Sequence, residues 1–193
     1  VEAYREQEWV TIYNKAVNLI QKEKVENAQE YIEIAILINH EKAENYLTLA
    51  ALQLQNIVEK NDAREKALNT LDRGLEADPR NSMLYNMKAD ISAQNNELEI
   101  AQGLYLKAIE YSDDPGPIMR KLLFIYIDLG ENQQAIEYSN ELMNKYPDDP
   151  DLYYNVGVLY QRLTLEMFDP ARDLFLQATA ESDPSIISEI YVS

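Results

Sequence analysis

Most of the side chains in this sequence that could do chemistry are carboxylates. The chain has 34 Asp and Glu residues, a single histidine and no cysteine. Acid–base catalysis needs two positioned groups, but among so many carboxylates a pair occurs at almost any spacing and indicates nothing. His40 lies in "INHEKAEN", between two apolar runs, where a turn role is favoured over catalysis. The absence of cysteine excludes a thiol nucleophile, a disulfide framework and a thiolate zinc site.

Two acidic clusters could bind calcium, because carboxylate oxygens are good ligands for hard cations. They are "SDDPGP" (112–117) and "YPDDPD" (146–151). Each precedes an apolar run, and aspartate is also a preferred residue at helix N-termini. We therefore expect helix capping instead of metal binding. Asp149 before Pro150 and Asp169 before Pro170 have the pattern of an N-cap followed by proline at the first helical position.

The remaining patterns argue against an enzyme. The sequence contains no Gly-rich phosphate loop, no second histidine for a metal pair and no serine in a nucleophile elbow. We expect no catalytic residues, no cofactor and no metal. The net charge of -17 repels phosphate backbones and anionic lipids, so nucleic acid and membrane are disfavoured as partners. The longest apolar runs, such as "LLFIYI" (122–127), are too short to span a bilayer, and we expect a soluble chain.

Small residues recur at nearly constant spacing. Alanine stands at 28, 67, 101, 135 and 171, at intervals of 39, 34, 34 and 36 residues. Four and seven residues after each alanine stand apolar or small residues on the same helical face, with Ser139 as the polar exception. A proline follows twelve to fourteen residues after four of the five alanines. The spacing indicates an internal repeat of two antiparallel helices, with small residues where their backbones approach closely.

The repeat pattern predicts helices at 5–21, 24–38, 42–57, 63–77, 82–94, 97–111, 116–128, 132–145, 149–163 and 169–181. The segment "SIISEIYVS" would begin one more helix. Gly130 in "LGEN" is suited to a helix C-terminus. No segment alternates strongly enough to predict a strand.

The repeat resembles the tetratricopeptide repeat, whose 34-residue unit has small and bulky residues at fixed positions. The fifth unit carries Gly157, Tyr160, Ala171, Phe175 and Ala178 in that pattern. The resemblance covers nearly the whole chain. Departures include Leu123 at a position usually occupied by Gly or Ala, and a longer turn, "NIVEKNDAREKA", in the second unit. We expect one array over 1–193, with repeats at about 9–42, 43–81, 82–115, 116–149 and 150–184 and a further helix at 185–193.

The resemblance implies an all-α, right-handed superhelical solenoid whose first helices line a concave groove. Members of the family generally bind peptides or partner domains and are not enzymes. The positions that project into the groove in members of the family are occupied here by residues that include Thr48, Met83 and Met87. From the whole inward set we take as partner-binding candidates Tyr13, Leu47, Asn86, Asp90, Arg120, Phe124, Tyr154 and Asn155. Each apolar residue at these inward positions could instead pack against the neighbouring repeat. Packing gives less reason for Arg120, Asn86 and Asn155 to occupy inward positions.

The sequence therefore predicts a non-catalytic scaffold that binds a neutral or basic protein or peptide in this groove. The alternative is a structural module that self-assembles by stacking its solenoid ends. The abundance of Asn, Ile and Tyr favours a bacterial source. The compartment stays open between cytoplasmic and periplasmic, because a leader could have been removed before Val1. Because solenoid ends need a polar cap, we expect the natural chain to continue beyond Ser193.

Overall fold

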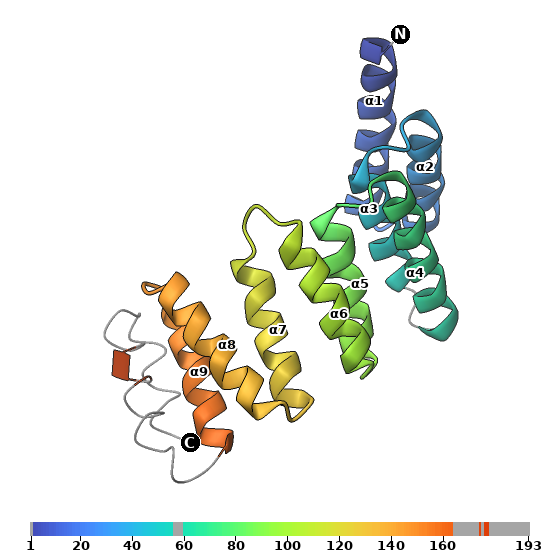
Figure 1. The fold of residues 1–193 in the computed structure, drawn as a ribbon. Helices are drawn as coiled ribbons and strands as arrows, with labels where there is room; N and C mark the ends of the chain where they lie inside the picture. The colour runs from blue at the N-terminus through green and yellow to red at the C-terminus, as the bar shows by residue number, and fades with distance from the viewer. Residues whose placement is uncertain (1, 56–59, 164–173, 175, 178–193) are drawn as a thin grey trace. The chain divides into compact units, whose positions relative to one another are not determined.

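The computed structural model describes residues 2–55, 60–163, 174, 176 and 177, and within them every regular element is an α-helix (Figure 1). The helices are α1 (Glu2–Gln21), α2 (Val25–Ile38), α3 (Ala43–Leu54), α4 (Lys60–Ala77), α5 (Ser82–Gln94), α6 (Leu98–Glu110), α7 (Gly116–Asp128), α8 (Asn132–Lys145) and α9 (Pro150–Leu163). The all-α prediction is confirmed for these residues, with each helix end within about three residues of its predicted place. The predicted helices at 169–181 and after 185 lie outside the described residues.

The helices form consecutive pairs in two compact units, which divide between Asp113 and Asp114. In unit 1, α1 packs on α2, α3 on α4 and α5 on α6, and α3 also contacts α5. In unit 2, α7 packs on α8 and α8 on α9. The predicted repeat bounds and the single array over 1–193 stay predictions.

The repeated small residues lie where the helices of a pair meet. Ala28, Ala67, Ala101 and Ala135 are fully buried, as the repeat predicted, and Ala171 lies outside the described residues. Gly74, seven residues after Ala67, is also buried. A Cβ atom on Gly74 would lie 3.0 Å from side-chain atoms of both Tyr46 on α3 and Leu84 on α5. Larger side chains at these positions would separate the helices, which explains why the core of each repeat contains small residues.

Three turns between paired helices have one local geometry. The residue after the C-cap has a positive φ at Glu23 (57°), Asn96 (60°) and Gly130 (72°). In the last of these turns Gly130 N donates to Ile127 O at 3.1 Å and Glu131 N donates to Tyr126 O at 2.9 Å. These two bonds define a Schellman motif, which satisfies carbonyls left free at the helix end. The predicted role of Gly130 is confirmed.

The two acidic clusters differ in their relation to the helix that follows. Asp149 Oδ1 accepts a hydrogen bond from Leu152 N at 3.2 Å, so the predicted N-cap of α9 is confirmed. The capping prediction for "SDDPGP" is wrong. Pro115 is the N-cap of α7, has αR geometry and makes no side-chain capping bond. Its carbonyl accepts from Ile118 N and Met119 N, because a proline with helical φ starts the first turn by itself.

Candidate interaction surface

The first helices of unit 1 are joined by hydrogen bonds between side chains. The hydroxyl groups of Tyr13 on α1 and Thr48 on α3 are 2.8 Å apart. One turn earlier on α1, Trp9 Nε1 donates to Asn45 Oδ1 at 2.9 Å. The Trp9 and Tyr13 rings stack with centroids 5.2 Å apart. These contacts place α1 beside α3, so that the two helices share one face.

A polar network holds the end of this face nearest the α2–α3 turn. Asn45 is fully buried, and its Nδ2 donates to Asn39 O at 2.9 Å, just after α2. Lys42 Nζ forms a 2.9 Å ion pair with Glu6 and lies 4.6 Å from the centroid of the Trp9 ring. Because its amide is satisfied on both sides, Asn45 stabilises the junction between the first two repeats.

The remaining predicted residues of unit 1 lie on α3 and α5. Leu47 is half-buried and packs against the hydrophobic core, as Tyr13 and Met87 do. Asn86 and Asp90 are half-buried on α5, and Asp90 accepts a 2.6 Å hydrogen bond from the Tyr105 hydroxyl on α6. Burial and this bond to Asp90 raise the pKa of Tyr105 above its ordinary value. Tyr13, Leu47 and Asp90 thus each contribute to packing, while part of each side chain stays accessible.

The predicted residues of unit 2 lie on α7 and α9. Arg120 forms an ion pair with Asp149, the N-cap of α9, so it has an intrachain partner that the sequence did not indicate. Phe124 is half-buried on α7, one turn after Arg120. Tyr154 and Asn155 are half-buried on α9. The eight predicted residues therefore form two groups of four, one in each unit.

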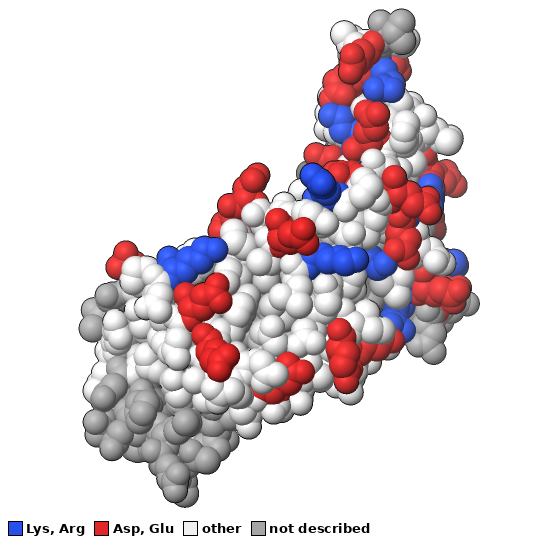
Figure 2. All heavy atoms as spheres, in the orientation of Figure 1, with Lys and Arg blue, Asp and Glu red and all other residues white. Residues whose placement is uncertain are grey.

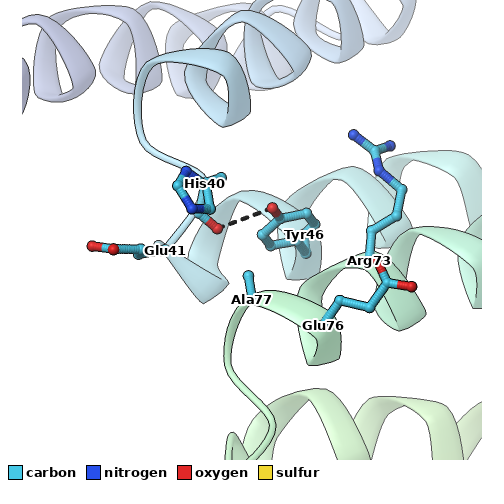
Figure 3. A pocket seen from close by; sticks show the side chains of 6 residues that line it. All are labelled: His40, Glu41, Tyr46, Arg73, Glu76 and Ala77. Carbon is cyan, nitrogen blue, oxygen red and sulfur yellow. Dashed lines mark hydrogen bonds between the residues drawn. The ribbon is translucent and has the colours of Figure 1, made fainter.

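A pocket of about 390 Å³ lies in unit 1, where the α2–α3 turn meets the end of α4 (Figure 3). The residues that line it are His40, Glu41, Tyr46, Arg73, Glu76 and Ala77. The Tyr46 hydroxyl donates to the backbone carbonyl of His40 at 2.9 Å, so the imidazole takes no part in this bond. Burial raises the pKa of Tyr46, while the nearby Arg73 opposes that shift. The bond from the neutral Tyr46 phenol to the His40 carbonyl stabilises the turn between α2 and α3. His40 lies in this turn, as predicted from the sequence.

Arg73, the cation of this pocket, is already paired. Its guanidinium donates to both carboxylate oxygens of Glu33 on α2, at 3.3 and 3.1 Å. This bidentate contact is the main reason that the pKa of Arg73 is raised. The charged side chains that line the pocket are therefore the carboxylates of Glu41 and Glu76 and the guanidinium of Arg73, which Glu33 neutralises. These groups do not include an activated nucleophile.

The chain is acidic, with a formal net charge of -17. Figure 2 shows Asp and Glu side chains spread across the visible face, with fewer Lys and Arg side chains among them. In the described part of the chain no helix is long and apolar enough to cross a bilayer. Among the same residues no group of three or more His, Asp or Glu side chains is arranged to hold a metal ion.

Sequence reasoning missed two contributors to these surfaces. Trp9 was not among the inward positions, although it is the only tryptophan and stands four residues before Tyr13, which places both on one helical face. That spacing could have identified it. The pairing of Arg120 with Asp149 joins residues 29 positions apart, and no local pattern indicates it.

Comparison with known proteins identifies the fold. No protein-family profile matches the sequence, and no curated protein matches it. Similar solved structures include MamA, 19% identical with a TM-score of 0.70, in a match that covers 91% of this chain and 92% of MamA. PilF of Pseudomonas aeruginosa is 17% identical with a TM-score of 0.69, covering 93% of this chain and 78% of PilF.

A third similar structure is YrrB, described as a TPR protein with an unusual peptide-binding site. It is 18% identical with a TM-score of 0.63, and the match covers 93% of this chain and 95% of YrrB. Identities this low establish a shared fold and nothing finer. The chain has the helical-repeat fold of tetratricopeptide-repeat proteins, as the sequence predicted.

Proposed function

We propose that this chain is a non-catalytic scaffold that binds a neutral or basic peptide or partner protein along the face formed by its first helices. The observation that carries the proposal is the continuity of this face in unit 1. Hydrogen bonds join α1 to α3, and α3 packs directly on α5. Tyr13, Leu47 and Asn86 lie half-buried on these three helices in turn. A row of partly accessible side chains on adjacent helices suits an extended or helical segment.

The side chains of this face supply two kinds of contact. Met83, at the start of α5, is 56% exposed and provides a flexible apolar surface that adapts to different ligands. Asn86, one turn later on the same helix, has an amide whose donor and acceptor atoms match those of a peptide backbone. Apolar anchors beside amide groups are the usual composition of peptide sites. The peptide-binding site described for YrrB, which has the same fold, supports the same class of ligand here.

The charge of the chain favours a basic partner over an acidic one. The formal net charge is -17, and Asp90 lies on the face itself. A negative field accelerates association with a cationic segment, and salt screens that field. The association rate of a basic peptide should therefore fall as the salt concentration rises, whereas an acidic peptide should be repelled.

In unit 2, taken by itself, Phe124 on α7 and Tyr154 and Asn155 on α9 are candidate ligand contacts of their own. Aromatic side chains at binding sites often contribute a large share of the affinity. Arg120 is already paired with Asp149, so a carboxylate on the partner would have to compete with that pair. We assign Arg120 a positioning role for α9 beside any contact with the ligand.

The proposal is tested by selecting peptides from a displayed random library on the immobilised protein. The selected peptides should be neutral or basic. For one of them, Kd is measured with the wild type and with Met83→Ala, Phe124→Ala and Tyr154→Ala. The matched control is Glu137→Ala on α8, an exposed residue of a second helix. Truncating a true anchor commonly costs about 2 kcal/mol, which weakens binding roughly thirtyfold.

Circular dichroism and the melting temperature of each variant separate loss of binding from loss of folding. Unchanged Kd values in all three folded variants would place the binding surface elsewhere on the chain. Enrichment of acidic peptides would contradict the charge argument.

A further inference from the structure

The outward face of α6 carries apolar side chains that the chain leaves exposed. Ile100 is 56% exposed and Leu106 is 47% exposed. Gly103 stands midway between them, and a Cβ atom added to it would have no atom within 4 Å apart from its chain neighbours and the backbone of its own helix. Two large apolar side chains on either side of an open glycine form a surface on which another helix could lie closely.

The sequence of this face is arranged symmetrically about Gly103. Ile100 and Leu106 lie three residues before and after it, and Glu99 and Lys107 lie four residues before and after it. All four side chains are exposed. Spacings of three and four residues keep them on one side of the helix. At equal distances on either side of Gly103, the face therefore carries two apolar residues, Ile100 and Leu106, and two residues of opposite charge, Glu99 and Lys107.

We propose that this face binds a second copy of the chain, with the two α6 helices antiparallel and Gly103 at their crossing point. In that arrangement a residue that lies n positions before Gly103 is level with the residue n positions after it on the partner helix. Ile100 then lies level with the partner's Leu106, and Glu99 level with the partner's Lys107. The two-fold axis repeats each contact.

Gly103 explains why the helices can approach closely at the crossing. Without a side chain at that position, the backbones are kept apart only by the residues on either side, and those are the apolar ones. A parallel arrangement would lose the charge complementarity, because Glu99 would lie level with the partner's Glu99. The exposed charges therefore select both the occupant and its orientation.

The exposed apolar residues of α2 do not have this symmetry. Leu37 near the end of α2 is 84% exposed, more than either residue on α6, and Ile34 is 41% exposed one turn before it. The α2 sequence, VENAQEYIEIAILI, contains no Lys or Arg that could pair with its glutamates in a second copy. Leu37 thus provides a matched control for nonspecific attraction between apolar surfaces.

The first test is the molecular mass of the full chain by sedimentation equilibrium, from micromolar to millimolar concentration at about 0.15 M salt. The wild type should show a monomer–dimer equilibrium. Leu106→Glu buries two uncompensated charges per dimer and should weaken the dimer by at least about tenfold. Leu37→Glu introduces the same charge on α2 and should leave it unchanged. A wild type that is monomeric throughout, or equal effects of the two substitutions, would overturn the proposal.

The second test exchanges the charges. Glu99→Lys places Lys residues level with one another across the dimer and should weaken it, although the substitution also reduces the net negative charge of the chain. General repulsion between two acidic chains predicts the opposite change for this variant. Lys107→Glu should also weaken the dimer, and circular dichroism checks its fold because Lys107 Nζ lies 5.4 Å from the centroid of the Tyr85 ring.

The double variant Glu99→Lys/Lys107→Glu has the net charge of the wild type and should restore dimerisation. Failure of this rescue would exclude the antiparallel arrangement.

The third test uses the absence of native cysteine. In Gly103→Cys, the only disulfide that can form joins two chains at the proposed crossing point, where the backbones are closest. Mild oxidation should produce a covalent dimer from Gly103→Cys much faster than from Leu37→Cys. Equal cross-linking rates would show random collision and would overturn the assignment of α6 as the interface.

Discussion

Arg120 on α7 forms an ion pair with Asp149, the residue that caps the N-terminus of α9. The two carboxylate oxygens of Asp149 have separate roles, since Oδ1 accepts from Leu152 N and Oδ2 faces the guanidinium. One side chain thus starts a helix and ties it to the first helix of the preceding repeat.

This arrangement predicts a graded response to substitution. Asp149→Ala removes both contacts and should lower the free energy of unfolding by about 1–2 kcal/mol. Asp149→Asn keeps a capping oxygen but loses the charge, and Arg120→Gln keeps the cap. Both should cost less than about 1 kcal/mol, because the pair is partly exposed. Urea unfolding of the three variants measures the differences. Equal losses in all three would contradict the division of roles.

Two glycines in second helices should respond oppositely to alanine. Gly103→Ala on α6 adds a methyl group in open space and should raise the free energy of unfolding by about 0.5–1 kcal/mol through helix propensity. Gly74→Ala on α4 would bring a methyl group within 3.0 Å of both Tyr46 and Leu84 and should lower it by about 1–3 kcal/mol. Thermal unfolding at low protein concentration, where α6 self-association does not contribute, measures both. Shifts of the same sign would mean that Gly74 is not at a close helix contact.

The register of the repeat is tested by the buried alanines. Ala101 is fully buried on α6, so Ala101→Leu should overpack the contact with α5 and cost about 1–3 kcal/mol. The matched control is Glu137→Leu on α8, where the side chain is exposed and the added volume points into solvent. Melting temperatures of the two variants check this difference. Negligible and equal shifts would place Ala101 away from the helix crossing.

Stability should fall at alkaline pH because tyrosine hydroxyls are buried. The pKa of Tyr105 is raised by burial and by its hydrogen bond to Asp90, and burial also raises the pKa of Tyr138. In the unfolded chain these phenols ionise near pH 10, whereas in the folded chain their raised pKa keeps them protonated to a higher pH. The stabilisation is therefore complete below pH 10 and is lost progressively as the pH rises above it.

Tyr105→Phe isolates one contribution to this effect. It should lower the free energy of unfolding by about 1 kcal/mol at neutral pH, because the hydrogen bond to Asp90 is lost. Above pH 10 the variant should lose stability less steeply than the wild type, so the two curves should converge. Urea titrations between pH 7 and pH 11 provide the comparison, and curves that stay parallel would exclude Tyr105 as a source of the alkaline loss.

Much of this molecule was predictable from local patterns in the sequence. Alanine at 28, 67, 101 and 135 marked the helix crossings, because a period near 34 residues with apolar positions at helical spacing has few other physical explanations. Gly130 and Asp149 marked a helix end and a helix start, because their preferences depend on backbone groups only a few residues away.

Tertiary structure alone decided which of the candidate side chains are engaged in contacts between repeats. Arg120 and Asp149 are 29 residues apart, Tyr13 and Thr48 are 35 apart, and Trp9 and Asn45 are 36 apart. Contacts between repeats depend on how complete helices pack, and no spacing within one helix specifies them. The same holds for Asp113 and Asp114, which resemble capping residues although the backbone of Pro115 starts α7 without them. The sequence determined the repeat because helix pairing is local, whereas packing between helices decided which candidate residues also hold the fold together.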